Sequence, residues 1–265
     1  MLNLALLKQT MRENRRLWCR CTLILVLGIL ICECVYGTET GEKIRQFLSV
    51  IPGMTGRVEK NGDQSMIAFL GLCLFGAFFF MVPAVYSVLG AVRLISGRME
   101  DGSMATLVSV IGNRSVILFT QSYWMVVSLL GMFLCTSTAG ILGGAILKPG
   151  RLETAQFLLL NLGSFCFHVM ISGFCFFLAC LVKKRERASM ALAGILAAAY
   201  LIFALPDLSS SLSAVGYLSV FSAFQPGLMI QGSVGLFWQL PLFAAVGLLL
   251  FQAGSMVLVK ADIPS

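Results

Sequence analysis

The chain has 265 residues, of which 58% are hydrophobic and 12% are charged, and its formal net charge is +7. A soluble domain carries about twice this fraction of charged residues, so this composition, with a mean hydropathy of +0.91, excludes a water-soluble globular protein. The length suffices for about six helices of ~20 residues joined by modest loops. We therefore expect an all-α, polytopic membrane protein that forms a single transmembrane domain over 1–265.

The N-terminal segment 1–18 is predicted to form an interfacial helix. Leu4, Leu7, Met11 and Trp18 share one face at 100° per residue. Basic side chains flank this stripe and can reach toward lipid headgroups: Lys8, Arg12, Arg15 and Arg16. A basic tail that merely sets the orientation of the chain is the alternative. Both interpretations place this end in the cytoplasm.

Six apolar segments follow and are predicted to span the membrane. They cover 17–36, 65–95, 115–147, 154–182, 188–205 and 234–259. The second is longer than a bilayer requires and contains Pro83, which predicts a tilt or a kink. Between the last two, 206–233 is apolar but broken by glycine and proline. We expect short outer or re-entrant helices there, with a backbone that other parts of the protein cover.

The distribution of positive charge predicts the orientation. With six spans and both termini on one side, that side holds 13 of the 19 Lys and Arg residues and the other side holds six. Basic loops of membrane proteins lie predominantly in the cytoplasm. We therefore expect a multi-pass protein of the plasma membrane with both termini cytoplasmic.

Sequence motifs for several catalytic classes are absent. The sequence contains neither a GxxxxGK[ST] phosphate loop nor HExxH, and its His, Asp and Glu residues show no metal-ligand spacing. We therefore expect no enzyme activity, no metal and no cofactor, and we interpret the nine cysteines as small buried hydrophobic residues. The sequence has no phosphate loop for ATP, and the spans lack the carboxylates near the membrane midplane that proton- or sodium-coupled carriers use. A partner protein is therefore expected to supply the energy for transport.

A histidine and a carboxylate lie within the predicted spans, in addition to Arg20 and Arg93 near the inner ends of two of them. Such residues are functional candidates by default. For His168 we favour a structural role, in which it forms a hydrogen bond with a neighbouring helix. Glu33 is the only carboxylate within the predicted spans and lies near one membrane interface. Gly140 and Gly144 have the spacing that permits close helix approach, either within one subunit or between two.

The connection 96–114 is the most informative segment. Residues 100–103 predict a helix start, with acidic residues in the first turn and a serine cap. Leu107, Val110 and Ile111 then form an apolar face. A short amphipathic helix between basic ends, parallel to the membrane, is a structure that another protein can bind.

Two motifs resemble those of the type-2 ABC exporter permeases. In the first, an acidic residue, Gly-Thr or Gly-Ser, a leucine, a serine and an arginine are matched by Glu100, Gly102, Ser103, Leu107, Ser109 and Arg114. Ile111 stands where the family usually has proline. In the second, the family's Tyr-Leu-Ser-Pro-Phe is similar to the stretch from Tyr217 to Phe221, with Val220 in place of proline, followed by Phe224.

The resemblance implies a permease without its own ATPase. Two such chains, identical or related, would pair, and each would bind a separate cytoplasmic ABC ATPase; nucleic acid is not an expected partner, whereas membrane lipid is. Segment 96–114, including Asp101, would be the coupling helix, and the basic loop with Lys183, Lys184 and Arg185 a second ATPase contact. Tyr217, Phe221 and Phe224 become candidates for the outer gate of the pathway.

The expected function is therefore ATP-driven export of an amphiphilic, drug-like or peptide-like substrate. A non-transporting membrane anchor or assembly protein is the alternative. An intramembrane enzyme is disfavoured, because the sequence offers one histidine and no pair of buried carboxylates.

Overall fold

The computed structural model describes residues 2–50, 65–208, 219–224, 226–230 and 236–260. All regular structure in these ranges is helical, which confirms the all-α fold for them. The predicted gate residue Tyr217 and parts of 206–233 lie outside the described residues.

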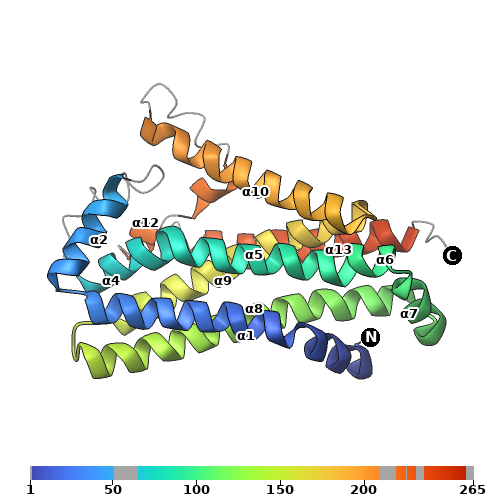
Figure 1. The fold of residues 1–265 in the computed structure, drawn as a ribbon, viewed down its shortest axis with the longest axis horizontal. Helices are drawn as coiled ribbons and strands as arrows, with labels where there is room; N and C mark the ends of the chain where they lie inside the picture. The colour runs from blue at the N-terminus through green and yellow to red at the C-terminus, as the bar shows by residue number, and fades with distance from the viewer. Residues whose placement is uncertain (1, 51–64, 209–218, 225, 231–235, 261–265) are drawn as a thin grey trace.

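Within the described ranges, five helices are long and apolar enough to cross a bilayer. They are α1 (Leu4–Val35), α8 (Arg114–Leu147), α9 (Thr154–Leu181), α10 (Arg185–Leu208) and α13 (Leu236–Lys260). Figure 1 shows α1, α5, α8, α9 and α13 along one common direction, with α10 inclined away from them. In their most apolar stretches, 67% of the residues of α9 but only 17% of those of α10 are buried within the chain. Helix α9 is therefore central and α10 peripheral.

The predicted second span is a succession of shorter helical pieces. These are α4 (Met66–Leu70), the π-helix η1 (Gly71–Phe78), α5 (Phe79–Ala91), the π-helix η2 (Val92–Gly97) and α6 (Arg98–Glu100). Pro83 lies inside α5, and π-helical turns stand on both sides of it. No single piece meets the length of a spanning helix, so five of the six predicted spans have a direct counterpart.

The predicted interfacial helix and the first span form one uninterrupted helix, α1. From Leu6 to Glu33 its buried face recurs every four residues, with one interval of seven between Asn14 and Cys21. Trp18 donates a hydrogen bond from Nε1 to the carbonyl oxygen of Ser128 on α8, at 2.8 Å. The N-terminal turns therefore pack against α8. The helix does not break near residue 17, where the predicted interfacial helix and the first span meet, because the buried face of α1 continues on both sides of that point.

The remaining described elements are short helices at the two ends of the bundle. Helix α2 (Glu39–Val50) follows α1, and α7 (Ser103–Ile111) follows α6. Of the predicted outer segment, the structure describes the end of α10, the 3₁₀-helix η4 (Val220–Ala223) and α12 (Pro226–Ile230). The predicted basic loop is shorter than expected, since α10 already begins at Arg185.

Candidate functional site

Contacts between segments far apart in sequence define one end of the bundle, which we call the basic end. The pairs are Asn3–Thr120, Glu13–Arg98, Glu100–Arg185 and Arg114–Val259. Figure 1 shows the first turns of α1, helix α7 and the last turns of α13 there. The exposed basic side chains at this end are Lys8, Arg12, Arg15, Arg16, Lys183, Lys184, Arg185, Arg187 and Lys260.

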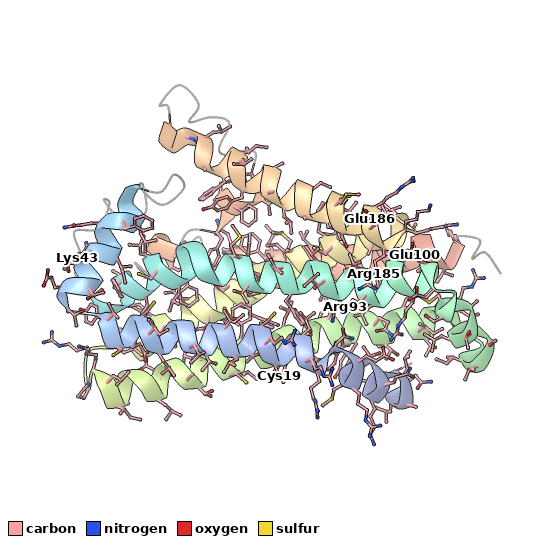
Figure 2. All side chains as sticks on the ribbon, viewed as in Figure 1. Cys19, Lys43, Arg93, Glu100, Arg185 and Glu186 are labelled. Atoms are coloured by element: carbon pink, nitrogen blue, oxygen red, sulfur yellow. The ribbon has the colours of Figure 1, made fainter. Side chains whose placement is uncertain are left out.

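The opposite end carries less positive charge among the residues that the structure describes. Its basic residues are Lys43, Arg45, Lys148 and Arg151. Figure 2 shows Lys43 far from Glu100, Arg185 and Glu186, which cluster at the basic end. These residues of the two groups that the sequence assigned to different sides thus lie at opposite ends of the bundle.

Helix α7 stands between two glycines with left-handed backbones. Gly102 has a φ of +71° and Gly112 a φ of +73°, a conformation that glycine adopts at little steric cost. Gly102 follows the helical run 66–100, and Gly112 ends α7, where its N–H bonds to the carbonyl oxygen of Val108. Asn113 then caps α8, its side chain accepting from Ser115 N at 2.9 Å. The segment is therefore a helix with two sharp ends.

The prediction of which residues form the apolar face of α7 is partly wrong. Met104 is 2% exposed, and Leu107, Val108 and Ile111 pack against the core. Val110, which was predicted to share this face, is 79% exposed. The inward side follows the spacing i, i+3, i+4, i+7 from Met104, which directs Val110 outward.

The predicted start of α7 also differs. Glu100 ends α6, Asp101 forms the turn, and Gly102 breaks the helix, so neither acid lies in the first turn of α7. Ser103 does not cap it. Its Oγ instead donates to the carbonyl oxygen of Arg98 at 3.4 Å. The sharp turn at Gly102 separates the acidic residues from the helix that they were expected to begin.

Glu100 instead caps a different helix. Its Oε2 accepts a hydrogen bond from the backbone N–H of Arg185 at 2.9 Å. Arg185 begins α10, and the first N–H groups of a helix lack internal partners and carry partial positive charge. The carboxylate therefore joins the two segments that the sequence nominated for partner contact, with Lys183 and Lys184 exposed beside the junction.

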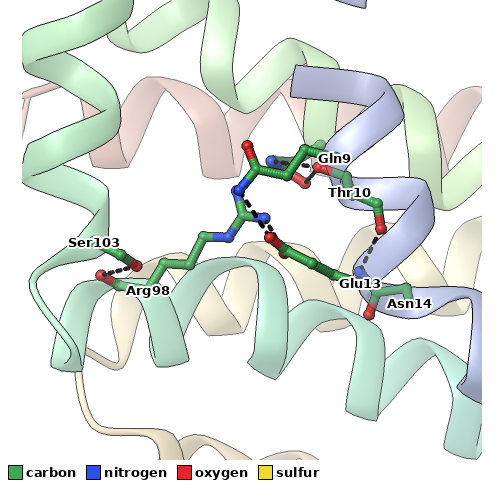
Figure 3. A network of polar contacts seen from close by, with 7 residues as sticks. Gln9, Thr10, Glu13, Asn14, Arg98 and Ser103 are labelled. Carbon is green, nitrogen blue, oxygen red and sulfur yellow. Dashed lines mark hydrogen bonds and ion pairs between the residues drawn. The ribbon is translucent and has the colours of Figure 1, made fainter. Parts of the chain in front are cut away.

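A polar network ties the same corner to α1 (Figure 3). Arg98 Nη2 pairs with Glu13 Oε2 at 2.8 Å, and the Arg98 side chain is 9% exposed. Gln9 donates to Glu13 Oε1 at 2.9 Å, while Thr10 and Gln121 join α1 to α8 through buried hydrogen bonds. The sequence does not predict this network. The one signal was a single acid, Glu13, among the four basic residues of the N-terminal segment.

Replacing Glu13 with alanine is expected to destabilise this corner by about 1–3 kcal/mol, because the guanidinium of Arg98 loses its acceptor while remaining buried. Thermal unfolding in detergent measures the effect. Glu39→Ala is the matched control, since the Glu39–Lys43 pair has side chains 85% and 70% exposed and such surface pairs contribute about 0–1 kcal/mol. Equal shifts for the two variants would contradict a structural role for Glu13.

The described gate candidates lie in an aromatic cluster. Phe221 and Phe224 are 7% and 0% exposed, and their ring centroids lie 6.0 and 5.5 Å from that of Phe167 on α9. Tyr200 of α10 meets Phe221 at 6.0 Å. Ser219 donates a hydrogen bond of 2.6 Å to the carbonyl oxygen of Ala199. Segment 219–224 is thus fastened between α9 and α10.

The single histidine is buried in α9. Nδ1 of His168 lies 2.7 Å from the carbonyl oxygen of Ser164, one turn earlier, so this nitrogen is placed to donate. Its ring also contacts Phe133 of α8, with centroids 5.6 Å apart. These contacts give His168 a packing role.

No protein-family model matches the chain, and no curated protein matches its sequence.

In the part of the chain that the structure describes, metal-ligating side chains form no cluster and cysteines form no disulfide. In the described ranges no three His, Cys, Asp or Glu residues are grouped so that they could hold a metal ion. All nine cysteines are free, and Cys19 and Cys34 are exposed rather than buried as expected. The basic end is distinguished by α7, a short helix with the outward apolar side chain Val110. The residues just before α7 contact α1 through Arg98 and α10 through Glu100.

Proposed function

We propose that the chain is the membrane-spanning permease subunit of an ATP-driven exporter of the type-2 ABC class. Its single strongest support is α7, which follows the helical run 66–100 at the basic end and exposes Val110 there. A protein without an energy source of its own needs such a surface for the subunit that supplies the energy. The matched motif from Glu100 to Arg114 falls on this same corner.

The connections of α7 suggest how movement would spread. A displacement of α7 would act on α1 through Arg98 and Glu13 and on α10 through Glu100 and Arg185. Charge-assisted hydrogen bonds are short and directional, so they transmit force better than lipid-facing apolar contacts. In this mechanism, closure of the ATPase would change the inclination of α1 and α10 and open a path for the substrate.

The proposed topology has six spans, with the run from Met66 to Glu100 as the second. Helical pieces follow one another there without a gap. The basic end would face the cytoplasm, as positively charged loops of membrane proteins do, and the membrane would be the plasma membrane. The exposed apolar side chains of α1 and α10 would contact lipid or a second permease chain, and the basic N-terminal turns would lie at the headgroups.

The aromatic cluster suggests the chemistry of the cargo. Phe221 and Phe224, held against α9, would form the outer closure of the path, and their apolar rings suit an amphiphilic, drug-like or peptide-like substrate.

A membrane anchor or assembly protein is the second candidate, because the same helix α7 could hold a partner in place without moving a substrate.

Purification of the tagged chain in mild detergent tests the proposal. We expect an ABC ATPase to co-purify and its ATP turnover to change when the permease is removed. A complex that lacks any ATPase would contradict the proposal. Deletion of the gene distinguishes the two candidates, since an exporter predicts lost resistance or secretion whereas an anchor predicts mislocalisation of its partner.

A further inference from the structure

Glu33 occupies a recess in the seam between α1 and α8, at the end opposite the basic end. It lies on the last turn of α1 and is 0% exposed. A Cβ on Gly143 would collide with Glu33 Oε2, and a Cβ on Gly144 would lie 3.6 Å from Oε1. Because only hydrogen atoms stand at those two positions of α8, the carboxyl group fits there. The glycines predicted to allow close helix approach thus accommodate an acidic side chain.

The carboxyl group has no polar partner in the described part of the chain. Neither Oε1 nor Oε2 accepts a hydrogen bond, and the two ion pairs found there involve other acids, Glu13 and Glu39. The space around the two glycines is otherwise apolar, since a Cβ on Gly143 would lie 2.7 Å from Leu30 and one on Gly144 2.8 Å from Leu152. An ionised carboxylate without a partner is among the costliest groups to bury.

The neighbouring titratable and charged groups do not offset this cost. Cys32 precedes Glu33 in α1, and its thiol interacts with that of Cys73 of η1. On α8, Gly143 and Gly144 lie at the contact with the carboxyl group. The other charged residues described at this end form no ion pair with Glu33: Glu39, Glu42, Lys43, Arg45, Lys148, Arg151 and Glu153.

We propose that Glu33 is a proton-binding site that holds α1 against α8. One isolated carboxyl suits a proton, because hard metal cations need about six or more oxygen ligands and the described residues provide no group of three acidic, His or Cys ligands. The protonated carboxyl is neutral and allows the seam to close. Loss of the proton requires Glu33 to reach water, so proton release accompanies separation of the two helices. This inference is independent of the proposed export function.

Carbodiimide labelling of the purified full chain tests the proposal. Dicyclohexylcarbodiimide is apolar and adds to protonated carboxyl groups that are shielded from water. Peptide mass spectrometry is expected to find it on Glu33 at neutral pH and to find much less in alkaline buffer. The exposed acids Glu39 and Glu42 of α2 serve as internal controls and should stay unlabelled. An unlabelled Glu33 at neutral pH, or labelling equal to that of α2, would overturn the proposal.

Two variants sharpen the test. Gly143→Ala should push the carboxyl from its recess and reduce labelling several-fold, whereas Gly194→Ala, whose Cβ would meet nothing within 4 Å, should label like the natural chain.

Glu33→Gln mimics the protonated acid, so its thermal midpoint should equal that of the natural chain at neutral pH. The natural chain alone should lose stability in alkaline buffer, because its folded form binds the extra proton. Strong destabilisation by Glu33→Gln at neutral pH would show that the fold needs the ionised form and would refute the site.

Discussion

Replacing Gly247 with valine is expected to separate α9 from α13 and to lower the stability of the protein sharply. A Cβ on Gly247 would lie 2.7 Å from the carbonyl carbon and oxygen of Val169 and 2.9 Å from Cα of Met170. A Cβ on Gly173 would in turn collide with the carbonyl group of Gly247. The two helices thus meet backbone to backbone, as small residues permit inside membranes.

The cost of Gly247→Val is expected to reach or exceed about 3 kcal/mol, the upper end of ordinary overpacking. Backbone atoms of α9 cannot move aside as the end of a flexible side chain does, so the whole helix must shift. The aromatic contacts between the same helices, Phe176–Phe251 and Phe167–Phe243, would be lost together with the crossing point. Thermal unfolding and the fraction of monodisperse protein in size-exclusion chromatography measure the effect.

Gly194→Val provides the matched control. It places the same side chain in α10, where a Cβ would have open space. It should cost no helix propensity, because glycine is about 1 kcal/mol less favourable than alanine in a helix and valine at most about 0.7 kcal/mol. Equal behaviour of the two variants would show that the α9–α13 crossing contributes nothing special to stability.

The long helices were predictable because lipid selects continuous apolar segments. The predicted spans 115–147 and 154–182 differ by one residue at most from the ends of α8 and α9. The π-helical turns on both sides of α5 were not predictable, because no residue type specifies them. The continuity of α1 across residue 17 was missed as well, since its buried polar residues Thr10 and Asn14 do not contribute to a hydrophobic stripe.

The contacts predicted within segment 96–114 differ from those in the structure. Sequence distance explains the error for Glu100, because its partner Arg185 lies 85 residues away and local rules consider only the first turn of the nearest helix. Val110 was misplaced for another reason. In an apolar helix of nine residues, several faces are hydrophobic, and only tertiary packing decides which one is buried. Glu33 was judged by its nearness to an interface, whereas the glycines of α8 determine its burial.

Replacing Val110 with aspartate is expected to abolish binding of the proposed ATPase without affecting the fold. Val110 is 79% exposed and therefore contributes little to the packing of α7. A charge placed in the centre of an apolar contact must lose its water without gaining a partner. A fall of at least about tenfold in the amount of co-purified ATPase is expected, which corresponds to about 1.4 kcal/mol.

Phe47→Asp is the matched control for this experiment, since Phe47 lies on α2 at the opposite end and is 69% exposed. It makes the same type of change, from an exposed apolar side chain to a charge, on a surface that the ATPase would not reach. Val110→Thr keeps the shape of the side chain and should retain most of the binding. If Val110→Asp and Phe47→Asp retain equal amounts of ATPase, α7 is not the surface that binds it, and force from ATP hydrolysis would have to enter through the exposed residues around Lys183 and Lys184 instead.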